Sequence, residues 1–194
     1  GMHTNCSLSK NGVNLFYDPK TDNQLSATAL KFIAGVMKHT QEFALVTNPT
    51  VNSYKRLVPG YEAPCYISWS DANRSTMIRI PAARGNSTRI EVRSVDPSSN
   101  PYLAISGILA SGLYGIENKV KTLQPIKKNL FKMSDSERKR LGIKNLPESL
   151  KEAIENFSSS SLMKETIGDF LFEKLIEANT REWNEYKVRV TSYE

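Results

Sequence analysis

Segments with strand character occur mainly in the first half of this chain, and segments with helical character dominate the second half. The expected strands are 13–17, 65–70, 76–80 and 88–94, and the expected helices are 26–45, 101–123, 134–141, 147–156, 162–178 and 180–190. Asn11-Gly12 is typical of a tight hairpin turn, and residues 51–64, which contain two prolines and a glycine, are expected to form a loop. This order predicts an α+β fold, an antiparallel sheet followed by helices.

Small residues recur along the expected helix 101–123, including Ala104, Gly107, Ala110 and Gly115. Such residues allow a helix to approach a neighbour closely, and we expect this helix to pack against the sheet. We also expect exposed apolar surface and a tendency to associate.

Charged and apolar residues alternate in the expected strand 88–94. Arg89, Glu91 and Arg93 share one face, while Ile90 and Val92 share the other. One interpretation is a solvated outer face with cross-strand ion pairs. The other is the floor of a charged pocket, in which Glu91 binds a hard cation and the arginines bind anions. Arg79 on the neighbouring strand favours the second interpretation.

The charge balance narrows the possible partners. The chain has 26 basic and 20 acidic residues and a net charge of +6. Its arginines cluster between 56 and 93, and arginine suits bidentate recognition of carboxylate or phosphate. A basic nucleic-acid-binding domain is the weaker alternative, because these arginines alternate with strand residues and the later basic segment also contains acids.

Other features limit the protein's environment. No apolar stretch approaches the roughly 20 residues of a membrane-spanning helix, and the N-terminus has no signal-peptide pattern. Two cysteines far apart in sequence indicate a reducing compartment, and two histidines exclude a histidine-rich metal cage. We therefore expect a cytoplasmic protein with no membrane or nucleic-acid partner.

Several motifs together resemble the bacterial class I type of glutamine synthetase. The most specific is the segment from Asn48 to Pro64, which reads NPTVNSYKRLVPGYEAP. The resemblance continues through Asn73-Arg-Ser75, Ile78-Arg-Ile-Pro81, Arg89-Ile-Glu-Val-Arg93 and Asp96-Pro-Ser-Ser-Asn-Pro-Tyr-Leu103, and it covers essentially the whole chain. It implies that residues 1–194 are the C-terminal portion of the catalytic domain, of glutamine synthetase/guanido kinase-like fold. The N-terminal β-grasp domain and the first half of the catalytic domain would then be absent.

The resemblance also implies an activity, a set of partners and roles for individual residues. The family joins ammonia to L-glutamate through γ-glutamyl phosphate, with ATP as co-substrate and Mg²⁺ or Mn²⁺ as cofactor, in a homo-oligomeric dodecamer. The implied catalytic residues are Glu62 and Arg74, and the implied metal ligands are His3 and Glu91. The implied substrate-binding residues are Arg56, Glu62, Arg74 and Arg93. The implied ATP-binding residues are Asn5, Ser7, Arg74, Arg79, Asn86, Ser87 and Thr88. Glu62 matches a mobile flap that captures ammonium and excludes water.

Two further alternatives concern turnover. The chain could be a truncated, inactive fragment, because most of the family's metal-binding glutamates lie in the part that is missing. It could also be a pseudoenzyme or interaction module that keeps the fold. Against the pseudoenzyme, every matched charged site residue is retained.

Overall fold

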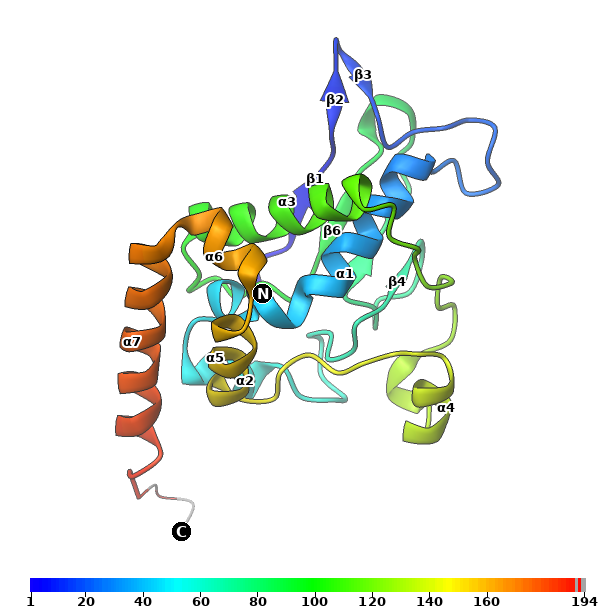
Figure 1. Ribbon diagram of the computed structural model, residues 1–194. Coiled ribbons are helices and arrows are strands. Elements are labelled where there is room, and N and C mark those ends of the chain that lie inside the picture. The colour runs from blue at the N-terminus through cyan, green and yellow to red at the C-terminus, as the bar shows by residue number, and fades with distance from the viewer. Residues whose placement is uncertain (191, 193–194) are drawn as a thin grey trace.

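The computed structural model describes residues 1–190 and 192 (Figure 1). The strands are β1 (Thr4–Cys6), β2 (Ser9–Lys10), β3 (Val13–Asn14), β4 (Trp69–Ser70), β5 (Ile78–Arg79) and β6 (Ile90–Val92). The α-helices are α1 (Ala27–Thr47), α2 (Val51–Arg56), α3 (Pro101–Glu117), α4 (Asp135–Arg140), α5 (Leu150–Ser158), α6 (Ser161–Ile167) and α7 (Asp169–Tyr186). Short 3-10 helices are η1 (Gly85–Ser87) and η2 (Leu130–Lys132). The α+β prediction is confirmed.

The main sheet has the strand order β1-β6-β5-β4. β1 and β5 pair antiparallel with β6, as predicted, but β4 and β5 are parallel, so the prediction of a wholly antiparallel sheet is wrong. The segment between β4 and β5 crosses over instead of forming a hairpin. Asn73 stabilises that crossover, because its Oδ1 accepts hydrogen bonds from the Ser75 amide and hydroxyl and its carbonyl accepts from Thr76.

One face of the sheet belongs to the hydrophobic core. Ile78, Ile90 and Val92 are fully buried and share a core cluster with Ile33 and Val36 of α1. The alternation predicted for strand 88–94 is therefore confirmed on its apolar side. The opposite face carries the charged residues discussed below.

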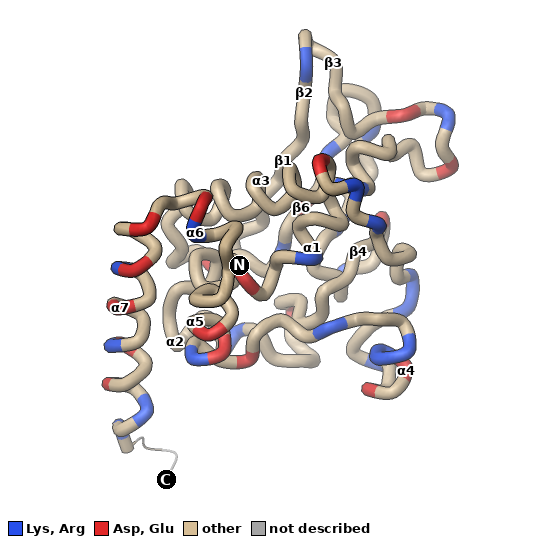
Figure 2. Tube along the Cα trace, in the orientation of Figure 1, with Lys and Arg blue, Asp and Glu red and all other residues tan. Residues whose placement is uncertain are grey.

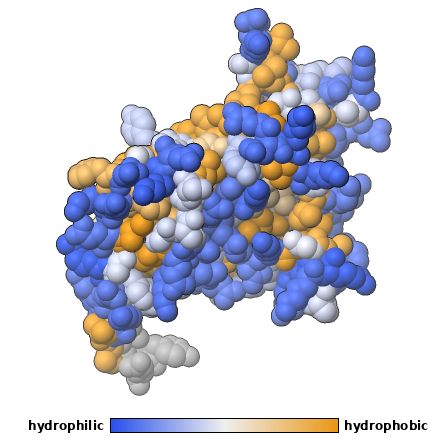
Figure 3. Space-filling model, in the orientation of Figure 1, coloured by the Kyte–Doolittle hydropathy of each residue, from blue (hydrophilic) through white to orange (hydrophobic). Residues whose placement is uncertain are grey.

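The small residues of α3 pack against α1 and not against the sheet, which corrects the prediction. A Cβ atom on Gly35 of α1 would lie 2.1 Å from the Ser111 carbonyl oxygen and 2.7 Å from Gly115 Cα. The glycines thus let the two helix backbones touch. On its outer side α3 exposes Tyr102 and Ile105. This agrees with the expected exposed apolar surface. Figure 3 shows apolar patches between hydrophilic ones on one side of the molecule.

Caps set most helix boundaries. Ser26 accepts from the Ala29 amide at the start of α1, and Asn100 accepts from the amides of the first turn of α3. The predicted loop 51–64 is wrong over its first part, since α2 forms there behind a Thr50–Ser53 capping box. The last two helices meet at Gly168, where φ is 80°, and not near residue 179 as predicted. The predicted helix 101–123 ends earlier than expected, at Glu117. The predicted strand 65–70 is shorter than expected, because only β4 forms there.

The Asn11-Gly12 hairpin is confirmed. Both residues have positive φ, 52° and 77°, as a two-residue turn between β2 and β3 requires.

Within the described part of the chain, no helix is both long and apolar enough to cross a membrane. Acidic and basic residues alternate along α7 in Figure 2.

Candidate functional site

A row of polar residues crosses the charged face of the sheet. Asn5, Glu91 and Arg79 are direct neighbours on β1, β6 and β5. Glu91 Oε1 lies 2.9 Å from His3 Nδ1, and Arg79 Nε donates to Glu91 Oε2 at 2.5 Å. Glu91 is only 5% exposed. Glu91 itself is therefore sheltered, which argues against a fully solvated sheet face, although His3 and Asn5 are exposed and cross-strand ion pairs are present.

The surroundings of Glu91 keep it ionised. Burial by itself raises the pKa of this carboxyl, but the hydrogen bond and positive charge of Arg79, followed by those of His3, outweigh burial and lower the pKa below its ordinary value. A carboxylate in this state can bind a cation.

Arg93 extends the charged face along β6. It is buried, and its Nη1 donates to the carbonyl oxygens of Arg74 and Thr76. Burial lowers the pKa of this guanidinium, and Glu91 opposes that effect. Its Nε is buried without a hydrogen-bond partner among the described residues. A buried donor of this kind is costly unless a ligand or water satisfies it.

Four of the predicted site residues surround one hollow of about 420 Å³. We call it the arginine hollow; its lining residues are Gly1, His3, Arg56, Tyr61, Glu62, Ala63 and Arg93. Arg56, the last residue of α2, donates through Nη2 to the Ser94 carbonyl at 2.6 Å and to Asn48 Oδ1 at 3.3 Å. The hollow brings two guanidinium groups, an imidazole and a carboxylate together.

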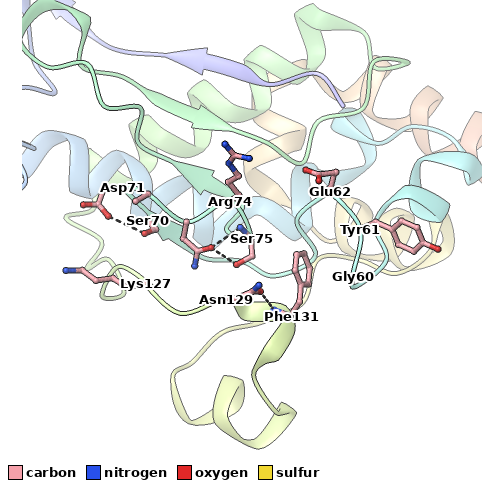
Figure 4. Close-up of a pocket in the computed structure, with 12 residues that line it drawn as sticks. Gly60, Tyr61, Glu62, Ser70, Asp71, Arg74, Ser75, Lys127, Asn129 and Phe131 are labelled. Atoms are coloured by element: carbon pink, nitrogen blue, oxygen red, sulfur yellow. Dashed lines mark hydrogen bonds between the residues drawn. The ribbon is translucent and has the colours of Figure 1, made fainter.

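A larger cavity of about 890 Å³ is lined in part by Gly60, Tyr61 and Glu62 of the segment 57–64 (Figure 4). We call it the outer cavity, and Arg74, Asp71, Lys127 and Phe131 are among its lining residues. Tyr61 and Glu62 line both spaces, so this segment forms the wall between them. Gly60 has a φ of 92°, which permits the sharp turn before Tyr61.

Five of the residues predicted to bind ATP form a separate group beside β1, whereas Arg79 lies on β5 and Arg74 lines the outer cavity. Asn5 and Ser7 are exposed on β1 and just after it, and residues 86–88 belong to η1 and its end. Arg89 joins them, because its Nε donates to Asn5 Oδ1 at 3.1 Å and its Nη1 to the Ser87 carbonyl at 3.2 Å. Thr88 is fully buried, so its side chain does not reach the surface.

Comparison with known proteins decides the family. The family model described as "Glutamine synthetase, catalytic domain" matches residues 1–194. The chain belongs to this family. A glutamine synthetase of Methanosarcina mazei is 54% identical over the whole chain, which spans 43% of that protein. A glutamine synthetase of Staphylococcus aureus is 49% identical, and the chain spans 44% of it.

The match confirms the resemblance found in the sequence. It also means that this glutamine synthetase catalytic-domain chain spans less than half the length of the curated relatives it matches.

The metal expected in this family can be tested against the donor atoms present. An imidazole and a carboxylate suit Mn²⁺, and a carboxylate suits Mg²⁺. However, His3 and Arg79 already contact both Glu91 oxygens. Among the described residues, no three His, Cys, Asp or Glu side chains converge. The donor atoms of His3 and Glu91 are thus of the types that bind a divalent cation, but a complete coordination shell needs further ligands.

Two residues that support the site were not identified from the sequence. Asn14 donates to the carbonyls of Asn86 and Thr88, which fixes the loop predicted to bind ATP. Arg84 is half-buried, and its guanidinium donates to the carbonyls of Asn23, Pro81 and Ala83. Neither has a sequence signal, because both act through main-chain carbonyls.

Proposed function

We propose that this chain acts as part of a glutamine synthetase, joining ammonia to L-glutamate at the expense of ATP. The observation that supports this most is the arginine hollow, where Arg56, Arg93, His3 and Glu62 meet next to the ionised Glu91. Guanidinium groups recognise carboxylates in a bidentate manner. A dicarboxylic amino acid matches this set of charges better than a neutral substrate does.

In the proposed reaction, Arg56 and Arg93 bind the glutamate and leave its γ-carboxylate free to react. An oxygen of that carboxylate forms a bond to the γ-phosphorus of ATP while the bond to ADP breaks. Ammonia then attacks the acyl carbon and the bond to phosphate breaks. Glutamine leaves together with the phosphate, which carries away the proton that the attacking nitrogen loses. Glu62 accepts the proton that ammonium loses.

Arg74 and Arg79 stabilise the phosphoryl group during its transfer in this proposal. Arg79 contacts Glu91 through Nε, so its Nη edge can bind phosphate oxygens. Arg74 lines the outer cavity next to Glu62. Fixed positive charges of this kind act most strongly where negative charge develops in the transition state.

His3 and Glu91 would hold Mg²⁺ or Mn²⁺ together with ligands from outside the described residues. When bound, such a cation neutralises part of the phosphate charge. Asn5, Ser7, Asn86, Ser87 and Thr88 would contact the nucleotide. Here the exposed Asn5 and Ser7 can use side chains, whereas the buried Thr88 can offer only main-chain groups.

The proposal extends to the organisation of the protein. Residues 1–194 form the C-terminal portion of the catalytic domain, and the β-grasp domain and the first half of the catalytic domain complete the site. The whole is a cytoplasmic dodecamer. The isolated chain is inactive, because its two metal ligands are too few to hold the cation.

A chimera tests the proposal. In it, this chain replaces the matching 194 residues of the Methanosarcina mazei relative, which is 54% identical. We expect the chimera to form glutamine from glutamate, ammonia and ATP, and Arg93→Ala to abolish that activity. A chimera that assembles like the relative but forms no glutamine would refute the proposal.

A further inference from the structure

We propose that Asp96 is a positioning residue that orients the Arg56 guanidinium toward the arginine hollow. The identity of the ligand there rests on the proposed function, whereas the orientation of Arg56 does not. Asp96 opens the motif Asp96-Pro-Ser-Ser-Asn-Pro-Tyr-Leu103, for which the reaction proposed above gives no role.

The guanidinium of Arg56 is held by protein groups along one edge. Its Nη2 donates to the Ser94 carbonyl at 2.6 Å and to Asn48 Oδ1 at 3.3 Å, and its Nε, which is buried without a hydrogen bond among the described residues, forms an ion pair with Asp96 Oδ2 at 3.4 Å. These partners come from two chain segments, Asn48 after α1 and residues 94–96 after β6. An arginine fixed in this way keeps little rotational freedom.

The third nitrogen, Nη1, lies beside Gly1 at the edge of the hollow. A Cβ atom on Gly1 would lie 2.9 Å from Nη1, and both residues line the hollow. The partners of Nη2 and Nε therefore direct Nη1 toward the space where a ligand can bind. Without Asp96, the guanidinium could rotate about its side-chain torsions and turn Nη1 away.

The two oxygens of Asp96 have separate tasks. Oδ1 accepts from the Ser98 amide at 2.8 Å and from the Ser98 hydroxyl at 2.6 Å, which closes a local turn. Oδ2 faces Arg56. Burial alone raises the pKa of this carboxyl, but the Ser98 hydrogen bonds and then Arg56 lower it below its ordinary value. The side chains of Asp96 and Arg56 are 14% and 23% exposed, so solvent screens this ion pair only weakly.

The division between the oxygens makes Asp96→Asn a selective test. The asparagine oxygen can still accept from Ser98, while its amide group replaces Oδ2 and presents a donor to the Arg56 donor. Asp18→Asn is a matched control. Asp18 Oδ1 also closes a turn, by accepting from the Lys20 amide at 3.0 Å, and no cation pairs with Asp18 among the described residues.

The first measurement is the ¹H–¹⁵N signal of Arg56 Nε in the 194-residue chain, identified by its loss in Arg56→Lys. We expect Asp96→Asn to shift this signal and to speed its exchange with water at least tenfold, while Asp18→Asn leaves it unchanged. Melting curves of both variants show whether the fold is retained. An unchanged Arg56 signal in folded Asp96→Asn would overturn the inference.

The second measurement uses the chimera. We expect Asp96→Asn to raise the KM for glutamate about tenfold, with kcat and the KM for ATP within about twofold of the parent. A general loss of kcat with no change in the glutamate KM would indicate a merely structural role and overturn the inference. If the Arg56 signal responds but the parent chimera makes no glutamine, the proposed function fails and the orientation of Arg56 by Asp96 stands.

Discussion

A methyl group at Gly115 would collide with the backbone of α1, because α1 and α3 touch at this residue. Its Cβ atom would lie 2.2 Å from the Lys31 carbonyl oxygen and 2.6 Å from the Gly35 amide nitrogen. Non-bonded heavy atoms prefer a separation of about 3.5 Å. Gly115→Ala must therefore push the two helices apart by about 1 Å.

The expected loss of stability follows from two opposing effects. Overpacking costs about 1–3 kcal/mol, whereas alanine in a helix interior recovers about 1 kcal/mol relative to glycine. The atoms in the way belong to the backbone and cannot rotate aside, so the cost should reach the upper end of that range. We expect the free energy of unfolding to fall by about 2 kcal/mol, which lowers Tm by about 4–8 °C.

Urea and thermal unfolding followed by circular dichroism measure this difference. Gly107→Ala is the matched control on the same helix, because its Cβ atom would lie 3.1 Å from Phe43 Cβ and 3.4 Å from Val46 Cγ2, so that the neighbours need to give by only a few tenths of an ångström. We expect that control to stay within about 1 kcal/mol of the unsubstituted chain. Equal stability of Gly115→Ala and Gly107→Ala would refute the close helix contact.

Three further predictions concern acid stability, metal and turnover. Burial raises the pKa of the Glu42 carboxyl, but hydrogen bonds from His39 and Ser160 outweigh burial and lower the pKa below its ordinary value. The ionised carboxyl therefore stabilises the fold at pH values above its ordinary pKa. This stabilisation is lost as the pH falls through the lowered pKa. Glu42→Gln should flatten the loss of stability between about pH 5 and pH 3 in unfolding titrations; an unchanged slope contradicts this. In the chimera, Glu91→Ala should weaken Mn²⁺ binding at least tenfold by calorimetry, and unchanged affinity would remove Glu91 from the metal site. The isolated chain should release no phosphate from ATP above the control without protein, and measurable turnover would show that its two ligands suffice.

Short sequence patterns correctly predicted the features that depend only on residues adjacent in the sequence. Alternation placed Ile90 and Val92 on the buried face of β6, and the prediction of the Asn11-Gly12 turn was correct. These features depend on side-chain periodicity and backbone conformation, which the sequence contains directly. The same alternation placed Glu91 and Arg93 together on the charged face.

Features that depend on long-range contacts could not be predicted in this way. The parallel pairing of β4 and β5 depends on a crossover held by Asn73, and the six-residue α2 is too short for a helical period. Likewise, the sequence motif suggested a ligand role for Arg56 but gave no sign that Asp96, forty residues later, lies beside it. The packing partner of α3 was mistaken because small residues allow close approach to a helix as well as to a sheet.

The division of the proposed reaction between Arg79 and Glu62 is the central claim that one measurement can test. Arg79 is fixed on β5 by Glu91, whereas Glu62 lies on the wall between the arginine hollow and the outer cavity. Rapid-quench analysis of the chimera follows γ-glutamyl phosphate and glutamine together.

Arg79→Ala should slow formation of the acyl phosphate by about 10²–10³. Glu62→Ala should form the acyl phosphate at nearly the parent rate but lose it to water instead of ammonia. Equal failure of both variants at phosphoryl transfer would contradict the account.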